Sequence, residues 1–128
     1  MKLLLDTHAL LWWWTDDPQL SVRARNAILE ESNSVLISSA SVWEISTKFR
    51  LGKLAIAEPA LKQFRELVEA DGFEHLPIIW QHSLLAGSYA MAHRDPFDRM
   101  LAAQSEIEKA TLVTCDAAFS SFGTSIFW

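Results

Sequence analysis

The chain has 128 residues, 50% of them hydrophobic and 21% charged, which predicts a single folded domain over residues 1–128 rather than a disordered chain. Its one cysteine, Cys115, excludes an internal disulfide, and without an apolar run long enough for a signal peptide or membrane span we expect a cytoplasmic protein. The net charge is −5, whereas most nucleic-acid-binding domains carry a basic surface. Either the protein does not bind nucleic acid, or its acids gather in a site where a metal neutralises them.

Short apolar runs alternate along the chain with longer helical patterns. In chain order the patterns predict a strand over Lys2–Leu5, a helix from about Thr7, a helix over Ser21–Glu31, a strand over Val35–Ser38, helices over Ser39–Leu51 and Pro59–Ala70, a strand over Leu76–Ile79, helices over Trp80–Ala92 and Pro96–Ala110, and strands over Thr111–Thr114 and Ser125–Phe127. Strands that alternate with helices favour a three-layer α/β/α fold around a central, mostly parallel sheet of four to five strands.

Three consecutive tryptophans, Trp12, Trp13 and Trp14, follow the first predicted strand. Neither a helix nor a strand turns three successive side chains onto one buried face. We therefore expect at least one ring to lie exposed or to meet a partner chain, since exposed apolar patches usually mark interfaces. The alternative is that two rings belong to the core and the third is only partly exposed.

Four acids stand at the ends of predicted strands or in the helices next to them. Asp6 directly follows the first strand, and Asp116 lies two residues after Thr114. Glu44 lies about one and a half turns into the helix after the second strand, and Asp98 in the first turn of the helix that leads into the fourth. Because ligands of parallel sheets bind beyond the carboxyl ends of the strands, these carboxylates have a route to one site.

Carboxylates gathered at one sheet edge repel one another, and they either shift their pKa values or bind a cation. No group of Cys and His residues has the spacing of metal ligands, so the fitting ion is hard and prefers oxygen, such as Mg²⁺ or Mn²⁺. Such an ion can hold a phosphate, lower the pKa of a water and stabilise a leaving oxygen.

Each acid taken alone also has a structural interpretation. Asp6 could cap the helix that follows it, Asp98 could favour the dipole of its helix, and Asp116 could be a turn or cap residue. Glu44 stands four residues before Lys48, the spacing of a surface ion pair. The functional hypothesis therefore depends on the joint pattern.

Four segments resemble, in order, the acidic motifs of PIN-domain ribonucleases. They are LLLDTHALL at 3–11, SASVWEI at 39–45, HRDPFDRMLAAQ at 93–104 and LVTCD at 112–116. The third segment, which is similar to one bacterial subgroup, is the sharpest part of the resemblance and holds two acids. Asp98 aligns with the family acid that precedes a small, apolar helix segment, whereas Asp95 before Pro96 is better interpreted as a helix cap.

The resemblance implies a Mg²⁺- or Mn²⁺-dependent endoribonuclease that leaves a 3′-hydroxyl and a 5′-phosphate. Asp6, Glu44, Asp98 and Asp116 would hold the metal, with Asp6 and Asp98 the first choices for direct coordination. Thr114 and Asp95 would support the site. Basic residues around the rim would contact RNA phosphates: Arg94, Arg99 and Lys48, together with Arg50 and Lys53.

Small stand-alone bacterial members of this family are typically VapC-type toxins, which a small antitoxin neutralises. The resemblance thus implies an antitoxin partner, whose basic arm would fill the acidic site, and the hydrophobic surplus fits a homodimer without membrane contact. A PIN-domain nuclease that works without an antitoxin is the nearest alternative.

Two other classes fit the chain less well. A phosphoryl-transfer enzyme with an aspartate nucleophile would place a second acid two residues after Asp6, where this chain has His8. A receiver-like regulatory module would have an acid pair at the end of the first strand and an aspartate after the third, where this chain has Leu5-Asp6 and Pro77-Ile78-Ile79. The chain also lacks a glycine-rich phosphate loop, so nucleotide-driven chemistry has no support.

Overall fold

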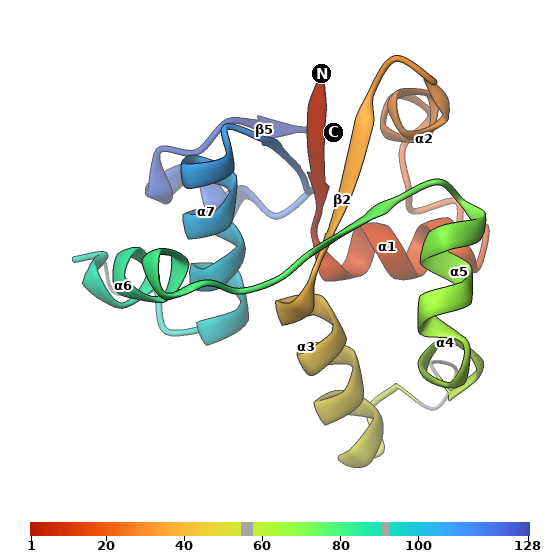
Figure 1. Cartoon of the computed structure of the whole chain (residues 1–128), viewed down its shortest axis with the longest axis horizontal. Helices are drawn as coiled ribbons and strands as arrows, with labels where there is room; N and C mark the ends of the chain where they lie inside the picture. Colours follow the sequence, from red (N-terminus) through yellow and green to blue (C-terminus); the bar gives the residue numbers. More distant parts are fainter. Residues whose placement is uncertain (55–57, 91–92) are drawn as a thin grey trace.

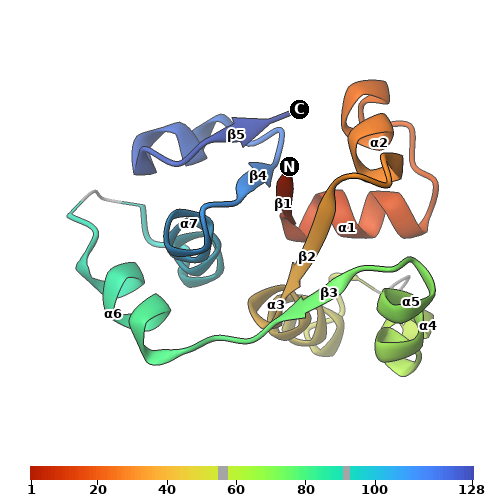
Figure 2. The same cartoon turned by 45° about the horizontal axis from the view of Figure 1, so that its top comes forward.

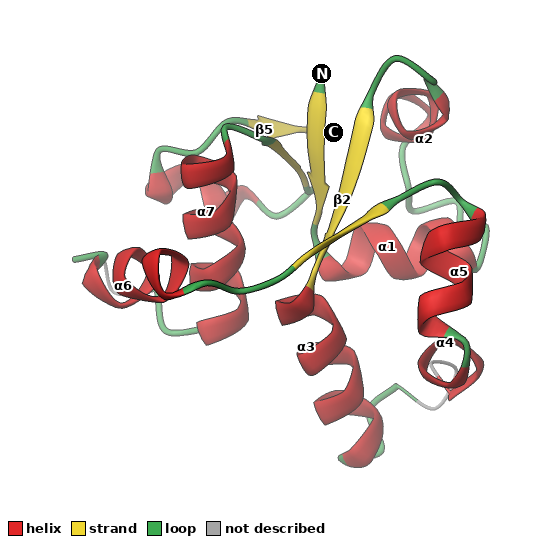
Figure 3. Ribbon diagram, viewed as in Figure 1, coloured by secondary structure: helices red, strands yellow, loops and turns green. Residues whose placement is uncertain are grey.

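The computed structural model describes residues 1–54, 58–90 and 93–128. Five strands form one sheet in the order β3-β2-β1-β4-β5, and every neighbouring pair is parallel. The strands are β1 (Lys2–Leu5), β2 (Ser34–Ser38), β3 (Glu74–Leu76), β4 (Thr111–Val113) and β5 (Ile126–Phe127). The predicted three-layer fold with a parallel central sheet is confirmed, and Figure 3 shows its helices in red around the yellow strands.

Helices cover both faces of this sheet. They are α1 (Thr7–Trp14), α2 (Val22–Leu29), α3 (Ser39–Arg50), α4 (Glu58–Lys62), α5 (Phe64–Ala70), α6 (Trp80–Ser88), α7 (Pro96–Glu108) and the 3-10 helix η2 (Ala117–Phe122). Figures 1 and 2 place α6 and α7 on one side of β1 and β2, and α1, α2, α4 and α5 on the other. Among the described residues, no helix combines the length and the apolar character needed to cross a membrane.

The strands are buried from both sides, which explains their near-continuous apolar sequences. Successive side chains of a strand point to opposite faces. Leu3 and Leu5 of β1 therefore pack in one core cluster with residues of α1 and α2, while Leu4 between them packs in a second cluster with residues of α7 and η2. This double burial fixes β1 at the centre of the molecule.

Three predicted elements differ from the structure. The strand expected over Leu76–Ile79 lies earlier, at Glu74–Leu76, and it ends before Pro77, which has no backbone N–H for the ladder. The helix expected over Pro59–Ala70 is two helices, α4 and α5, separated at Gln63. Helix α6 ends at Ser88, before the predicted end at Ala92, and residues 91–92 lie outside the described part of the chain.

The three consecutive tryptophans are all partly buried, so none of them is the exposed ring that the sequence predicted. Each ring has an aromatic partner from a different part of the chain, in turn Trp128, Phe73 and Phe64. The indole N–H groups of Trp13 and Trp14 both donate to one carboxylate oxygen of Asp71, each at 3.1 Å. Segments on several sides of α1 thus partly bury all three rings. This removes the main argument for an interface at the tryptophan cluster, which was an exposed ring.

Candidate active site

The order of the strands reverses at β1. The chain runs from β1 to β2 and β3 on one side, and then crosses to β4 on the other side of β1. In open parallel sheets, such a reversal leaves a crevice beyond the carboxyl ends of the strands. Asp6 follows β1 at this point, while Thr114 and Asp116 follow β4.

A cavity of about 170 Å³ lies there, and it collects the acids that the sequence singled out. Its lining includes the carboxylates of Asp6, Glu44, Asp95, Asp98 and Asp116. These residues come from the ends of β1 and β4 and from the helices α3 and α7. The predicted convergence of distant acids on one site is therefore seen in the structure.

Asp6 is buried, with 6% of its surface exposed. Its carboxylate accepts the backbone N–H of Ala9 at 2.7 Å and so caps α1. Burial raises the pKa of Asp6, the Thr114 hydroxyl and the Ala9 N–H lower it again, and the nearby Glu44 raises it further. Asp6 therefore caps α1, as one interpretation predicted, and it also lines the acidic cavity; its role as a metal ligand stays a prediction.

Thr114 links two of the acids. Its hydroxyl interacts with the carboxylate of Asp6, and its oxygen accepts the backbone N–H of Asp116 at 3.0 Å. Asp116 itself is exposed and caps η2 by accepting the N–H of Ala118 at 2.9 Å. The expected hydrogen bonding of Thr114 within the acidic site agrees with these contacts.

Glu44 is buried, with 4% exposure, although it forms the ion pair that its spacing suggested. The ammonium group of Lys48 lies 2.5 Å from the Glu44 carboxylate, one helical turn further along α3. Next to it, the hydroxyl of Thr7 donates to the hydroxyl oxygen of Ser41 at 3.0 Å, and both side chains are buried. This contact joins α1 to α3 next to the cavity that Asp6 and Glu44 line.

Asp98 is partly buried, and its carboxylate lies 3.0 Å from the Nε2 atom of His93. Burial raises the pKa of Asp98 to about 6; the His93 contact opposes this rise, and the charges of Asp95 and Glu44 add to it. Asp95 caps α7 by accepting the N–H groups of Phe97 and Asp98, as its position before a proline predicted. Asp95 thus orients the first turn of α7, which carries Asp98.

The structure corrects the expected role of Arg99. Its guanidinium donates to the backbone carbonyls of Ala86, His93 and Tyr89 at 2.9, 2.7 and 2.6 Å. Arg99 therefore joins α7 to the end of α6 and to the segment after it, and it does not line the acidic cavity, which weakens its expected contact with RNA phosphates. Arg94, by contrast, is exposed.

The carboxylates supply the oxygen ligands that a hard divalent cation prefers, and burial raises the pKa of two of them, Asp6 and Asp98. Among the residues that the structure describes, no three His, Cys, Asp or Glu side chains are yet grouped closely enough to hold a metal. Each of the four acids is instead engaged by a local partner, which for Glu44 is Lys48 and for Asp98 is His93. Each of these contacts uses one carboxylate oxygen, so the other oxygen of Glu44 and of Asp98 remains available to a metal.

Sequence reasoning missed three residues that shape the cavity: His93, Thr7 and Ser41. His93 opens the HRDPFD segment, but a histidine five residues before an acid has no distinctive spacing. Thr7 and Ser41 meet only through the packing of α1 on α3. Their contact therefore could not be derived from either segment alone.

Comparison with known proteins assigns the domain. The family model described as PIN domain matches residues 3–124. Ribonuclease VapC16 of Mycobacterium tuberculosis is 36% identical over 70 residues, which are 52% of this chain and 50% of that protein. The chain thus spans about half the length of the curated relative it matches.

Solved structures share the fold over nearly the whole chain. VapBC2 from Rickettsia felis, solved bound to a DNA fragment from their promoter, matches 99% of this chain and 98% of its own with a TM-score of 0.73 and 18% identity. FitAcB from Neisseria gonorrhoeae matches 98% of this chain and 96% of its own with a TM-score of 0.69 and 22% identity. At these identities the likeness establishes the fold.

Proposed function

This chain belongs to the PIN domain family, and from that premise we propose that it is an endoribonuclease dependent on Mg²⁺ or Mn²⁺. The observation that carries the proposal is the acidic cavity, in which Asp6, Glu44, Asp98 and Asp116 come together from four separate segments. The raised pKa values of Asp6 and Asp98 support it, because carboxylates that ionise reluctantly favour a divalent cation between them.

Asp6 and Asp98 would hold the metal directly, and Glu44 and Asp116 partly through water. When bound, a divalent ion neutralises the charge of a phosphate and lowers the pKa of a nearby water. The chain itself orients the ligands: Thr114 holds Asp6 and the backbone of Asp116, while Asp95 fixes the first turn of α7. These contacts fix the carboxylate of Asp6, the backbone at Asp116 and the helical turn that carries Asp98.

In the proposed reaction a water attacks the phosphorus in line with the departing oxygen. The bond from the water oxygen to phosphorus forms, and the bond from phosphorus to the 3′-oxygen breaks. The attacking water gives up a proton to solvent and the departing 3′-oxygen takes one up from solvent, so that one fragment ends in a 3′-hydroxyl and the other keeps a 5′-phosphate. Lys48, which lines the cavity, and the exposed Arg94, which precedes Asp95 in the chain, would contact neighbouring phosphates of the RNA.

We further propose that the protein is the toxin of a toxin–antitoxin pair, acts in the cytoplasm and forms a homodimer. The name of the curated relative, Ribonuclease VapC16, supports the nuclease, and the VapBC2 structure supports an antitoxin partner. The negative charge of the cavity fits a basic antitoxin segment, in which an arginine would occupy the place of the metal. A nuclease that works without an antitoxin would share the same site, and it would not arrest growth when produced alone.

The decisive experiment is RNA cleavage by wild type, Asp6→Asn and Asp98→Asn protein during a titration with Mg²⁺ or Mn²⁺. Each substitution removes a charge at nearly constant shape, so we expect metal-dependent cleavage by wild type alone. Circular dichroism of the three proteins should be the same. Equal cleavage by all three at every metal concentration would refute the assignment of these acids.

A further inference from the structure

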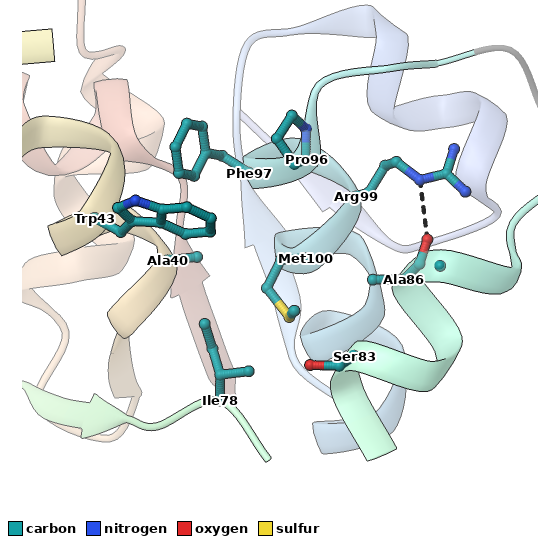
Figure 4. A pocket seen from close by; sticks show the side chains of 10 residues that line it. Ala40, Trp43, Ile78, Ser83, Ala86, Pro96, Phe97, Arg99 and Met100 are labelled. Atoms are coloured by element: carbon teal, nitrogen blue, oxygen red, sulfur yellow. Dashed lines mark hydrogen bonds between the residues drawn. The ribbon is translucent and has the colours of Figure 1, made fainter. Parts of the chain in front are cut away.

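A second hollow of about 200 Å³ lies between α3, α6 and α7, beside the acidic cavity. We call it the Trp43 groove and define it by its lining side chains: Ala40, Trp43, Ile78, Phe97 and Met100, opposite Ser83 and Ala86. Figure 4 shows the rings of Trp43 and Phe97 on one side of the groove and α6 on the other, with Met100 between them. None of these residues belongs to the set of acids proposed to hold the metal.

The groove and the acidic cavity are built from adjacent residues of the same two helices. Trp43 immediately precedes Glu44 in α3, and Phe97 immediately precedes Asp98 in α7. Successive side chains of a helix point about 100° apart, so each helix presents an acid to the cavity and an aromatic ring to the groove. The two hollows are therefore neighbours along both helices, which suits a polymer that occupies them together.

Trp43 is fixed in orientation although 59% of its surface is exposed. Its ring centroid lies 4.8 Å from that of Phe97 at an angle of 79°, which is the edge-to-face arrangement that aromatic pairs favour. An aromatic side chain that is both held and open to solvent is suited to stack on a flat partner.

The groove is apolar apart from one charged residue. The one charged residue in its lining is Arg99, whose guanidinium is directed to the backbone carbonyls of Ala86, His93 and Tyr89. Pockets for drug-sized ligands measure about 300–1,000 Å³, so this smaller hollow suits one flat ring system. A neutral ring in the groove and a charged phosphate at the acids match the two faces of a nucleotide.

We propose that the Trp43 groove binds a nucleobase of the RNA substrate, next to the phosphate that is cut, by stacking it on Trp43. This inference rests on the proposed nuclease function and adds a base-binding position to it. Stacking reads the flat face that every base has, so the groove contributes affinity and placement, with a preference among bases set by its size.

A second apolar patch on α6 supplies a matched control. Trp80 and Leu84, 70% and 67% exposed, stand four residues apart on one face of the helix, and neither lines the groove. If apolar surface in this region served only to join two copies of the chain, substitutions at Trp43 and at Trp80 would act alike. If the groove takes a base, only the change at Trp43 affects RNA.

The experiment measures cleavage of a short single-stranded RNA cut by the wild type, and of the same RNA with an abasic nucleotide on either side of the cut. For Trp43→Ala we expect kcat/KM about tenfold or more lower on the intact RNA, since stacking contributes about 1–3 kcal/mol and about 1.4 kcal/mol is tenfold. On the abasic RNA, wild type and Trp43→Ala should cut equally. Trp43→Phe should recover most of the loss, Trp43→Leu should not, and Trp80→Ala should behave as wild type.

Three results would overturn the groove assignment: equal cleavage by wild type and Trp43→Ala, equal recovery by leucine and phenylalanine, or a Trp43→Ala defect that persists on every abasic RNA. A fall in the sedimenting mass of Trp43→Ala relative to wild type would instead identify an interface between copies. Binding of the same RNAs, fluorescently labelled, to Asp6→Asn protein separates the two hypotheses. Binding that depends on Trp43 without any wild-type cleavage overturns the proposed function alone.

Discussion

The acidic cavity and the Trp43 groove share two helices, α3 and α7, but they are held in shape by different forces. In the cavity, Asp6, Asp95 and Asp116 each accept a backbone N–H at the start of a helix, so main-chain geometry fixes their positions. In the groove, Trp43 and Phe97 are held by ring packing. A change of charge should therefore abolish the first site without reshaping it, whereas a change of side-chain volume should reshape the second.

The largest effect is expected when two acids that both cap helices are compared. Asp116→Asn should lower kcat for RNA cleavage by about a hundredfold or more, because it removes a charge from the site that stabilises the transition state. Asp95→Asn should lower it by less than about tenfold, because asparagine caps a helix as well as aspartate does. Single-turnover cleavage at saturating metal measures both.

A comparison of Asp95→Asn with Asp98→Asn decides which acid of the HRDPFD segment binds metal. A loss by Asp95→Asn as large as that of Asp98→Asn would contradict the assignment of Asp95 as a positioning residue. Thermal unfolding serves as the control, since Asp95→Asn and Asp98→Asn should both melt within a few degrees of the wild type.

A smaller effect is expected when the hydroxyl of Thr114, which contacts Asp6 and the backbone of Asp116, is removed. Thr114→Val keeps the shape of the side chain but removes its interactions with Asp6 and with the Asp116 N–H. Loss of such a supporting contact typically costs about 10- to 100-fold in metal affinity or activity, so the apparent Kd for Mg²⁺ should rise within that range. Thr111→Val, at the other end of β4, is the matched control, and an equal shift for both variants would contradict the role of Thr114.

The smallest effect concerns the stability of the metal-free protein. Asp98 has a pKa of about 6 in the folded chain against an ordinary 3.8, so the folded state binds the proton more tightly than the unfolded state. Ionisation of Asp98 therefore opposes folding, and this destabilisation grows as the pH rises from about 4 through about 6.

Asp98→Asn should accordingly stabilise the metal-free protein at neutral pH. The expected gain in the free energy of unfolding is on the order of 1 kcal/mol, after discounting for the partial exposure of the carboxylate. The gain should disappear near pH 4, where Asp98 is protonated. Urea unfolding in the presence of a chelator at both pH values measures it, and an equal or larger gain at the lower pH would contradict the explanation.

The contrast between the two sites also explains what could be predicted from the sequence. Positions such as Asp6 and Asp116 follow directly from the chain, because topology brings the carboxyl ends of β1 and β4 to one edge of the sheet. Glu44 and Asp98 lie inside helices, so the predicted elements gave them a route to the same edge, and the family resemblance then supported their assignment. The fold class could also be predicted from the sequence, because apolar residues repeat at different periods in strands and in helices.

The parts that could not be predicted depend on how side chains from separate helices pack. The burial of Trp12–Trp14 requires Phe64, Phe73 and Trp128 to close around α1. The role of Arg99 depends on carbonyls that become available where α6 ends. The groove needs α3, α6 and α7 together, and no single segment contains its pattern.

The capping role of three acids has a consequence for how this molecule can change over generations. A codon change from aspartate to asparagine at Asp6 or Asp116 removes a negative charge but keeps the oxygen that starts the helix. Such a variant would lose catalytic activity but keep the fold. It would keep the surfaces that bind other molecules, so it would compete with the active protein for those molecules.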